Sequence, residues 1–171
     1  MKNLYLLFIA FVTLTITNAQ TYQVTFEVNT EAIVGLGGEV GPNGMYLGGG
    51  IFSTANAHAM SDADGDGIWS VTVPIAAGTT GYFIFLNSPN DGGDWGKKET
   101  LSNDCSDPGN YNDRPLPAIT GDMTIQHCFG TCDTGGVCTA PATPANAITS
   151  YSASFDTDAD VFVGGDNAEV T

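Results

Sequence analysis

The sequence has few positive charges and few charged residues of any kind. Lysine and arginine number 4 among 171 residues, against 19 acids, and charged residues make up 13% of the chain, compared with about 25% in most soluble domains. Such a surface cannot neutralise phosphates, so nucleic-acid binding and adhesion to anionic lipid are excluded as functions. The hydrophobic fraction of 42% is sufficient for a core, which also excludes an acidic disordered chain.

Helix-forming patterns are scarce as well. After residue 19 the chain has five leucines, and glycine or proline interrupts nearly every window long enough for three helical turns. Apolar residues alternate with polar ones instead, as in half-buried strands. The segment 82–86 is apolar on both faces, so we expect a central strand covered on both sides. The expected strands are 22–28, 68–73, 82–86 and 123–128, with shorter ones at 32–36, 45–47 and 97–101.

These short strands and glycine-rich turns predict an all-β fold. We expect an immunoglobulin-like two-sheet β-sandwich, disulfide-bonded, over residues 20–138. The segment 139–147 has two prolines and small residues, which is typical of an extended linker. Alternation resumes in 148–171, where we expect the start of a second β-sandwich module that the sequence does not complete.

The one long apolar run lies at the N-terminus. Lys2 precedes a mostly apolar stretch over 4–16, and small residues lead to Ala19. This pattern predicts a signal peptide over 1–19 that is cleaved after Ala19. The run is shorter than the roughly 18 apolar residues that a membrane span needs. We therefore expect a secreted or cell-surface protein with no membrane segment after cleavage.

Four cysteines lie late in the chain, and an even number in an exported protein indicates disulfides. Cys105–Cys128 would tie two strand-like segments across a long loop, and Cys132–Cys138 would close a glycine-containing turn. We expect these two pairs. A zinc site that uses His127 and the later cysteines is the alternative, although the spacing lacks paired short C-x2-4-C motifs.

Three aspartates at alternate positions, Asp62, Asp64 and Asp66, form the run DADGDGIW over 62–69. Such spacing gathers carboxylates inside a tight loop, as in calcium-binding loops. The twelfth position of that pattern is Val73 instead of glutamate, and a hairpin turn explains the same residues without an ion. We expect a turn and no cofactor, with calcium as the open alternative.

Trp95 lies in a glycine-rich loop directly after the apolar strand, with two lysines beside it. An exposed indole is costly unless something packs on it, and the C–H face of a sugar ring stacks well on indole. The alternative is that Trp95 folds back over the edge of the sandwich. Catalysis has less support, because no carboxylate pair stands out and His58 and His127 have structural explanations.

The order of these segments resembles a known family. It comprises the strand 22–28, a glycine-rich segment ending at Phe52, the DADGDGIW run and the strand 82–86 with its tryptophan loop. This succession is similar to the starch- and glycogen-binding type of carbohydrate-binding module. The continuation over 95–99, 110–114 and 128–132 resembles a module of secreted multidomain proteins from polysaccharide-degrading bacteria, some with glycoside hydrolase domains.

The resemblance implies a hairpin at the aspartate run and a loop aromatic that stacks on glucan. The family usually has a tryptophan after a Gly-x-Phe-Asn segment, where this chain reads GGIFS over 49–53. We predict a non-catalytic module that binds polysaccharide within a longer protein. A structural or adhesion spacer, or the accessory part of a glycoside hydrolase, is the alternative. The predicted binding residues are Trp95, Tyr111, Phe52, Lys97, Glu99 and Asn87.

Overall fold

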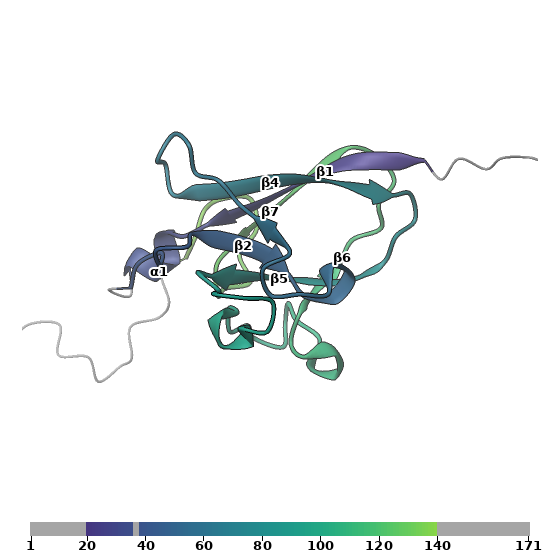
Figure 1. The fold of residues 1–171 in the computed structure, drawn as a ribbon. Helices are drawn as coiled ribbons and strands as arrows, with labels where there is room; N and C mark the ends of the chain where they lie inside the picture. Colours follow the sequence, from purple (N-terminus) through teal and green to yellow (C-terminus); the bar gives the residue numbers. More distant parts are fainter. Residues whose placement is uncertain (1–19, 36–37, 140–171) are drawn as a thin grey trace, which may run out of the picture. The chain divides into compact units, whose positions relative to one another are not determined.

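A computed structural model describes residues 20–35 and 38–139 (Figure 1). The predicted signal peptide, the predicted second module and all but the first residue of the predicted linker lie outside these residues. No helix within the described ranges is long and apolar enough to cross a membrane.

The first sheet has three strands, in the order β4 (Ile68–Ala76), β1 (Thr21–Asn29) and β7 (Met123–Cys128). β1 lies antiparallel to β4 and parallel to β7. The alternation predicted for β1 is confirmed, because Val24, Phe26 and Val28 are fully buried. One face of this sheet is therefore apolar and packs inward.

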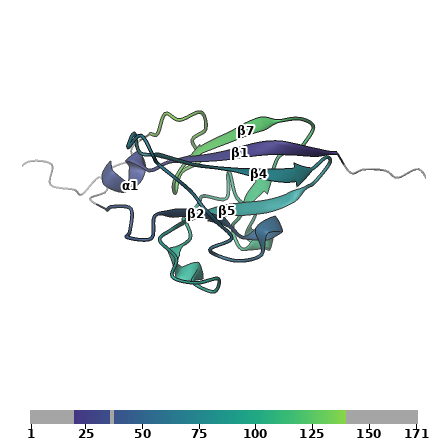
Figure 2. The same cartoon turned by 45° about the horizontal axis from the view of Figure 1, so that its top comes forward.

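The second sheet is antiparallel and has four strands, in the order β3 (His58–Ala59), β2 (Met45–Gly48), β5 (Gly81–Asn87) and β6 (Arg114–Leu116). The two sheets lie one over the other (Figures 1 and 2), and their inner side chains form one hydrophobic core. Phe26 of β1 packs edge-on against Phe83 of β5, with ring centroids 5.0 Å apart. The all-β, two-sheet sandwich predicted from the sequence is confirmed, while its immunoglobulin-like character stays a prediction.

β5 is covered on both faces, as its sequence predicts. Phe83 and Phe85 point into the main core, whereas Ile84 and Leu86 belong to a second apolar cluster with Ala55 and Leu101. We call the connections on the side of this outer face, together with the disulfide-bonded turn after β7, the loop layer. It comprises residues 49–57, 88–113 and 129–138, with the 3₁₀ helices η1 (Gly50–Phe52), η2 (Trp95–Lys97) and η3 (Pro108–Asn110).

Two of the shorter predicted strands are wrong. Residues 32–36 were expected to be extended, but Glu31–Gly35 forms the short helix α1. The side chain of Asn29 accepts a hydrogen bond from the Glu31 N–H at 2.8 Å, which favours a helical start over a further strand residue.

The segment 97–101 joins β5 only through an isolated bridge between Lys98 and Leu86 in the described structure. The backbone N–H of Phe85 donates to the Glu99 carboxylate at 3.2 Å, while the Glu99 N–H donates to the Phe85 carbonyl at 3.0 Å. The Glu99 side chain thus accepts the hydrogen bond that a backbone carbonyl of a neighbouring strand would accept, so strand pairing with β5 does not continue beyond this point.

The predicted disulfide pairing is also wrong. The bonds join Cys105 to Cys132 and Cys128 to Cys138. After β7 the chain turns back on itself, with the Cys128 N–H donating to the Asp133 carbonyl at 3.2 Å and His127 bridging to Thr134. This return brings Cys138 to the end of β7 and leaves Cys132 at the turn, within reach of Cys105. All four cysteines are paired in disulfides, which overturns the zinc alternative.

Candidate functional site

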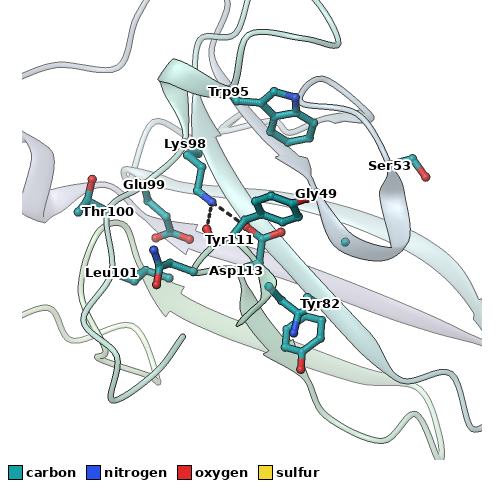
Figure 3. A pocket seen from close by; sticks show the side chains of 13 residues that line it. Gly49, Ser53, Tyr82, Trp95, Lys98, Glu99, Thr100, Leu101, Tyr111 and Asp113 are labelled. Atoms are coloured by element: carbon teal, nitrogen blue, oxygen red, sulfur yellow. Dashed lines mark hydrogen bonds and ion pairs between the residues drawn. The ribbon is translucent and has the colours of Figure 1, made fainter. Parts of the chain in front are cut away.

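A cleft of about 970 Å³ opens in the loop layer over the second sheet (Figure 3). Its walls come from the turn after β2, the start of β5 and two parts of the long connection between β5 and β6, one around η2 and one after η3. The lining residues are Gly49, Gly50, Ser53, Tyr82, Trp95, Lys98, Glu99, Thr100, Leu101, Asn110, Tyr111, Asn112 and Asp113.

Two aromatic side chains are exposed at this cleft. Trp95, the first residue of η2, is 40% exposed, and Tyr111, which follows η3, is 86% exposed. Trp95 thus does not fold back as a buried cover on the sandwich. The two rings come from two parts of the β5–β6 connection, which we call the two aromatic loops, and both line one opening (Figure 3). Large exposed aromatic groups gathered at one hollow are typical of a binding surface.

Hydrogen bonds from backbone N–H groups to aspartate side chains stabilise both aromatic loops. In the first loop, Asp94 accepts from the Asn90 N–H at 3.0 Å and Asp91 accepts from the Gly93 N–H at 2.8 Å. In the second loop, Asp107 accepts from the Gly109 N–H at 2.8 Å at the start of η3. Aspartate therefore satisfies backbone donors where neither loop has a strand partner.

The backbone of the second loop is held in an unusual conformation. Tyr111 and Asn112 both have a φ of 57°, in the left-handed region that residues other than glycine rarely occupy. Across the cleft Gly50 has a φ of 43°, and a Cβ placed there would lie 1.8 Å from the Tyr82 carbonyl oxygen. Only glycine fits this close approach between η1 and β5.

Lys98 joins the two aromatic loops. Its Nζ donates to the Tyr111 carbonyl oxygen and, at 2.8 Å, to Asp113 Oδ1. The side chains of Lys98 and Asp113 are 22% and 8% exposed, so this ion pair is more shielded than an ordinary surface pair. Both interactions are drawn in Figure 3.

A buried ion pair lies beneath the cleft. Arg114 binds both carboxylate oxygens of Glu99, at 2.9 and 2.7 Å, and the two residues are 1% and 2% exposed. Glu99 also accepts from the Gly130 N–H at 2.8 Å, and Arg114 Nη2 donates to the carbonyls of Cys128 and Thr131. The pair therefore ties β6 to both the aromatic loop and the disulfide-bonded turn.

Tyr82 and Asp107 form a second polar contact at the edge of the cleft. The Tyr82 hydroxyl donates to Asp107 Oδ2 at 2.6 Å, and Asn110 donates to the same oxygen at 2.7 Å. The hydrogen bond from Tyr82, followed by those from Asn110 and Gly109, lowers the pKa of Asp107. The same hydrogen bond raises the pKa of Tyr82, with smaller contributions from desolvation and the Asp107 charge.

The structure brings together some of the predicted site residues. Trp95 and Tyr111 line the same cleft, and Glu99 lies at its base with its carboxylate occupied by Arg114. Phe52 instead packs edge-on against Phe26, with ring centroids 5.6 Å apart, and Lys97 is exposed outside the cleft lining.

Asn87 also lies outside the cleft lining. Its side chain accepts from the Gly41 N–H at 2.9 Å and donates to the Glu39 carbonyl at 3.0 Å. It therefore holds the chain before β2.

Sequence reasoning missed several cleft residues, because their neighbours in space are distant in the chain. Lys98 differs from Lys97 only in the contacts its side chain makes. The amides that flank Tyr111 in the run NYND over 110–113 are the one local signal, since an aromatic between turn-forming polar residues is often exposed. The missed residues are Tyr82, Lys98, Asn110, Asn112 and Asp113.

The aspartate run forms a loop held by its own carboxylates. Ligand atoms of Asp62, Asp64 and Asp66 lie within 4.8 Å of one another. Asp62 accepts from the N–H groups of Gly65, Asp66 and Gly67, at 2.9, 3.1 and 3.2 Å. These bonds fit the predicted turn, and calcium binding stays an untested alternative.

Neither histidine lines the cleft. His58 packs edge-on against Phe52, with ring centroids 5.1 Å apart. Burial, followed by the nearby Arg114 charge, lowers the pKa of His127 to about 4. Its Nδ1 is buried and has no hydrogen-bond partner among the described residues.

Fold and site together define a class: a disulfide-bonded two-sheet β-sandwich with an aromatic-lined cleft on the loops that cover one sheet. No protein-family model matches the sequence, and no curated protein is significantly similar to it.

Proposed function

We propose that this protein is a secreted, non-catalytic module that binds chains of uncharged sugars. The observation that carries the proposal is the exposure of Trp95 and Tyr111, at 40% and 86%, on two loops that line one cleft. A sugar ring offers an apolar C–H face to an aromatic ring, and its hydroxyl groups require hydrogen-bond partners at the edge.

The charges at the cleft support an uncharged ligand. The two cations of the cleft region, Lys98 and Arg114, are each paired with a carboxylate. The whole chain has a formal charge of −15, which repels acidic polymers at low ionic strength. An uncharged sugar avoids that repulsion and can use the amides of Asn110 and Asn112.

The carboxylates of the cleft do not suit glycoside hydrolysis. Such enzymes need one carboxylic acid that donates a proton and a second carboxylate that acts as base or nucleophile. Glu99 and Asp113 instead accept hydrogen bonds from Arg114 and Lys98. We therefore propose binding without catalysis by this module, and any hydrolase activity would belong to other domains of the same chain.

Export is part of the proposal. The two disulfides fit an extracellular protein, and the predicted signal peptide would provide the route. The alternative function, a structural or adhesion spacer, would have no use for exposed aromatic rings at a cleft. The exposure of Trp95 and Tyr111 therefore favours binding.

The test is retention on a panel of insoluble glucans and of other uncharged and acidic polysaccharides. We expect the wild type to be retained by at least one uncharged member. Trp95→Ala should weaken that retention about two- to tenfold, because stacking on one aromatic contributes roughly 0.5–1.5 kcal/mol. Trp69→Phe is the matched control, because Trp69 packs against the core. Retention of Trp95→Ala at the wild-type level would refute the site, and no retention of the wild type would refute the function.

A further inference from the structure

We propose that Lys98 is a positioning residue, which fixes the Tyr111 ring relative to Trp95 and so prepares the cleft for its ligand. This inference rests on the proposed function. It assigns Lys98 no direct contact with the ligand, because its ammonium group is already taken up by the Tyr111 carbonyl and Asp113.

The first argument is that Lys98 physically connects the two aromatic residues. Its backbone N–H donates to the Trp95 carbonyl at 3.3 Å at the end of η2. Its side chain reaches the backbone of Tyr111 in the other loop. One residue thus contacts the main chain of both aromatic residues, and Figure 3 shows its side chain extending toward Tyr111 and Asp113.

The second argument is the conformation that Lys98 supports. Tyr111 and Asn112 are consecutive residues in the left-handed region, which asparagine tolerates but an aromatic residue such as tyrosine disfavours. Such a conformation persists where surrounding contacts determine it. Here the Asn112 N–H donates to the Asp107 carbonyl at 2.9 Å, and the Lys98 side chain donates to the carbonyl of Tyr111.

The third argument is that the Tyr111 ring itself has little support. The residue is 86% exposed, so its orientation depends on the backbone that carries it. Without Lys98 the loop would sample other conformations, and ligand binding would have to restore the bound one. The entropy lost when the ligand orders this loop lowers the affinity, even though every contact to the ligand is kept.

The test compares Lys98→Met with Lys97→Met. The two substitutions remove the same charge from adjacent positions, but Lys97 is exposed and lies outside the cleft lining. We expect Lys98→Met to lower the affinity for a soluble fragment of the retained polysaccharide roughly tenfold, measured by calorimetry. Lys97→Met should stay within about twofold of the wild type. Lys98→Arg keeps the positive charge and N–H donors in a larger, planar group, and it should retain more of the affinity than Lys98→Met.

A ligand-free measurement separates this inference from the proposed function. NMR relaxation and φ-dependent couplings should show Tyr111 and Asn112 losing their fixed left-handed conformation in Lys98→Met and keeping it in Lys97→Met. An unchanged loop in Lys98→Met overturns the inference, even if no glycan binds the wild type. A loosened loop with wild-type affinity overturns it as well. If Lys98→Met does not fold, Asp113→Asn weakens the same clamp and should loosen the same two residues.

Discussion

The outer faces of the two sheets differ in what covers them. On the first sheet, Thr25 and Thr72 face outward and hydrogen-bond to each other at 2.9 Å in an exposed setting. On the second sheet, Ile84 and Leu86 are fully buried beneath the loop layer. The outer face of the first sheet, which we call the first face, carries polar side chains, as the strand alternation predicts. The outer face of the second sheet is apolar and is covered by the loop layer, which contains the cleft.

The difference shows how irregular chain is made rigid enough to form a site. The first face needs only the ladder hydrogen bonds of its strands. The loop layer has few such bonds, and it is held by a buried ion pair, by carboxylates that accept from backbone N–H groups and by two disulfides. The two disulfides join cysteines that are 27 and 10 residues apart in the sequence. In the chain-entropy description, a disulfide that closes a loop of such length contributes about 3 kcal/mol to stability. We therefore expect side-chain substitutions to lower the free energy of unfolding strongly in the loop layer and weakly on the first face.

The largest effect is expected from Arg114→Met. This change leaves the Glu99 carboxylate buried without its cation, so the free energy of unfolding should fall by about 3–5 kcal/mol. Urea denaturation measures it. Thr25→Val on the first face is the control and should change stability by about 0.5 kcal/mol or less. Equal losses in the two variants would contradict the comparison.

A smaller, pH-dependent effect is expected at His127, which packs between the sheets with its ring 6.1 Å from that of Phe83. Its pKa is lowered from 6.5 to about 4, so the unfolded chain takes up the proton first as the pH falls. Stability from this group is complete above about pH 6.5 and is lost toward pH 4. After solvent screening is allowed for, the loss should be about 2 kcal/mol.

The measurement is the unfolding free energy of wild type and His127→Gln across that pH range. Protonation of the many carboxylates affects both proteins, so their difference isolates the histidine. The wild type should lose stability relative to the variant as the pH falls. Parallel curves would mean that His127 is not held neutral by the core and by Arg114.

The smallest effect concerns the aspartate run, which makes a turn between β3 and β4. Asp62→Ala removes the acceptor of three backbone N–H groups and should cost about 1–2 kcal/mol. Asp64→Ala is the control, because Asp64 makes no side-chain hydrogen bond within the described residues. Thermal melts with calcium and with chelator complete the test. Turn chemistry alone predicts unchanged melting temperatures, and a rise with calcium that both variants abolish would show a metal site.

Much of the fold could be predicted from the sequence because strand periodicity is a local property. Val24, Phe26 and Val28 lie on one face because alternate residues of any strand do. The predicted strand 32–36 is wrong because the Asn29 side chain accepts from the Glu31 N–H at the start of a helical turn, and a count of apolar positions does not register that contact.

The candidate site could be predicted only in part. Trp95 and Tyr111 stand out because large aromatic groups in polar loops require an explanation. The distinction between Lys97 and Lys98 depends on where the Tyr111 carbonyl lies, and no local pattern contains that information. The disulfide pairing was missed for the same reason, since the return of the chain after β7 decides which cysteine meets Cys128.

An NMR titration of the protein with soluble fragments of uncharged polysaccharides tests the proposed binding site most directly. We expect saturable shifts of the Trp95 indole N–H and of the amides of Tyr111 and Asn112, while the amides around Thr25 on the first face stay unchanged. Shifts centred on Thr25, or no shifts with any uncharged glycan tested, would refute binding at the cleft.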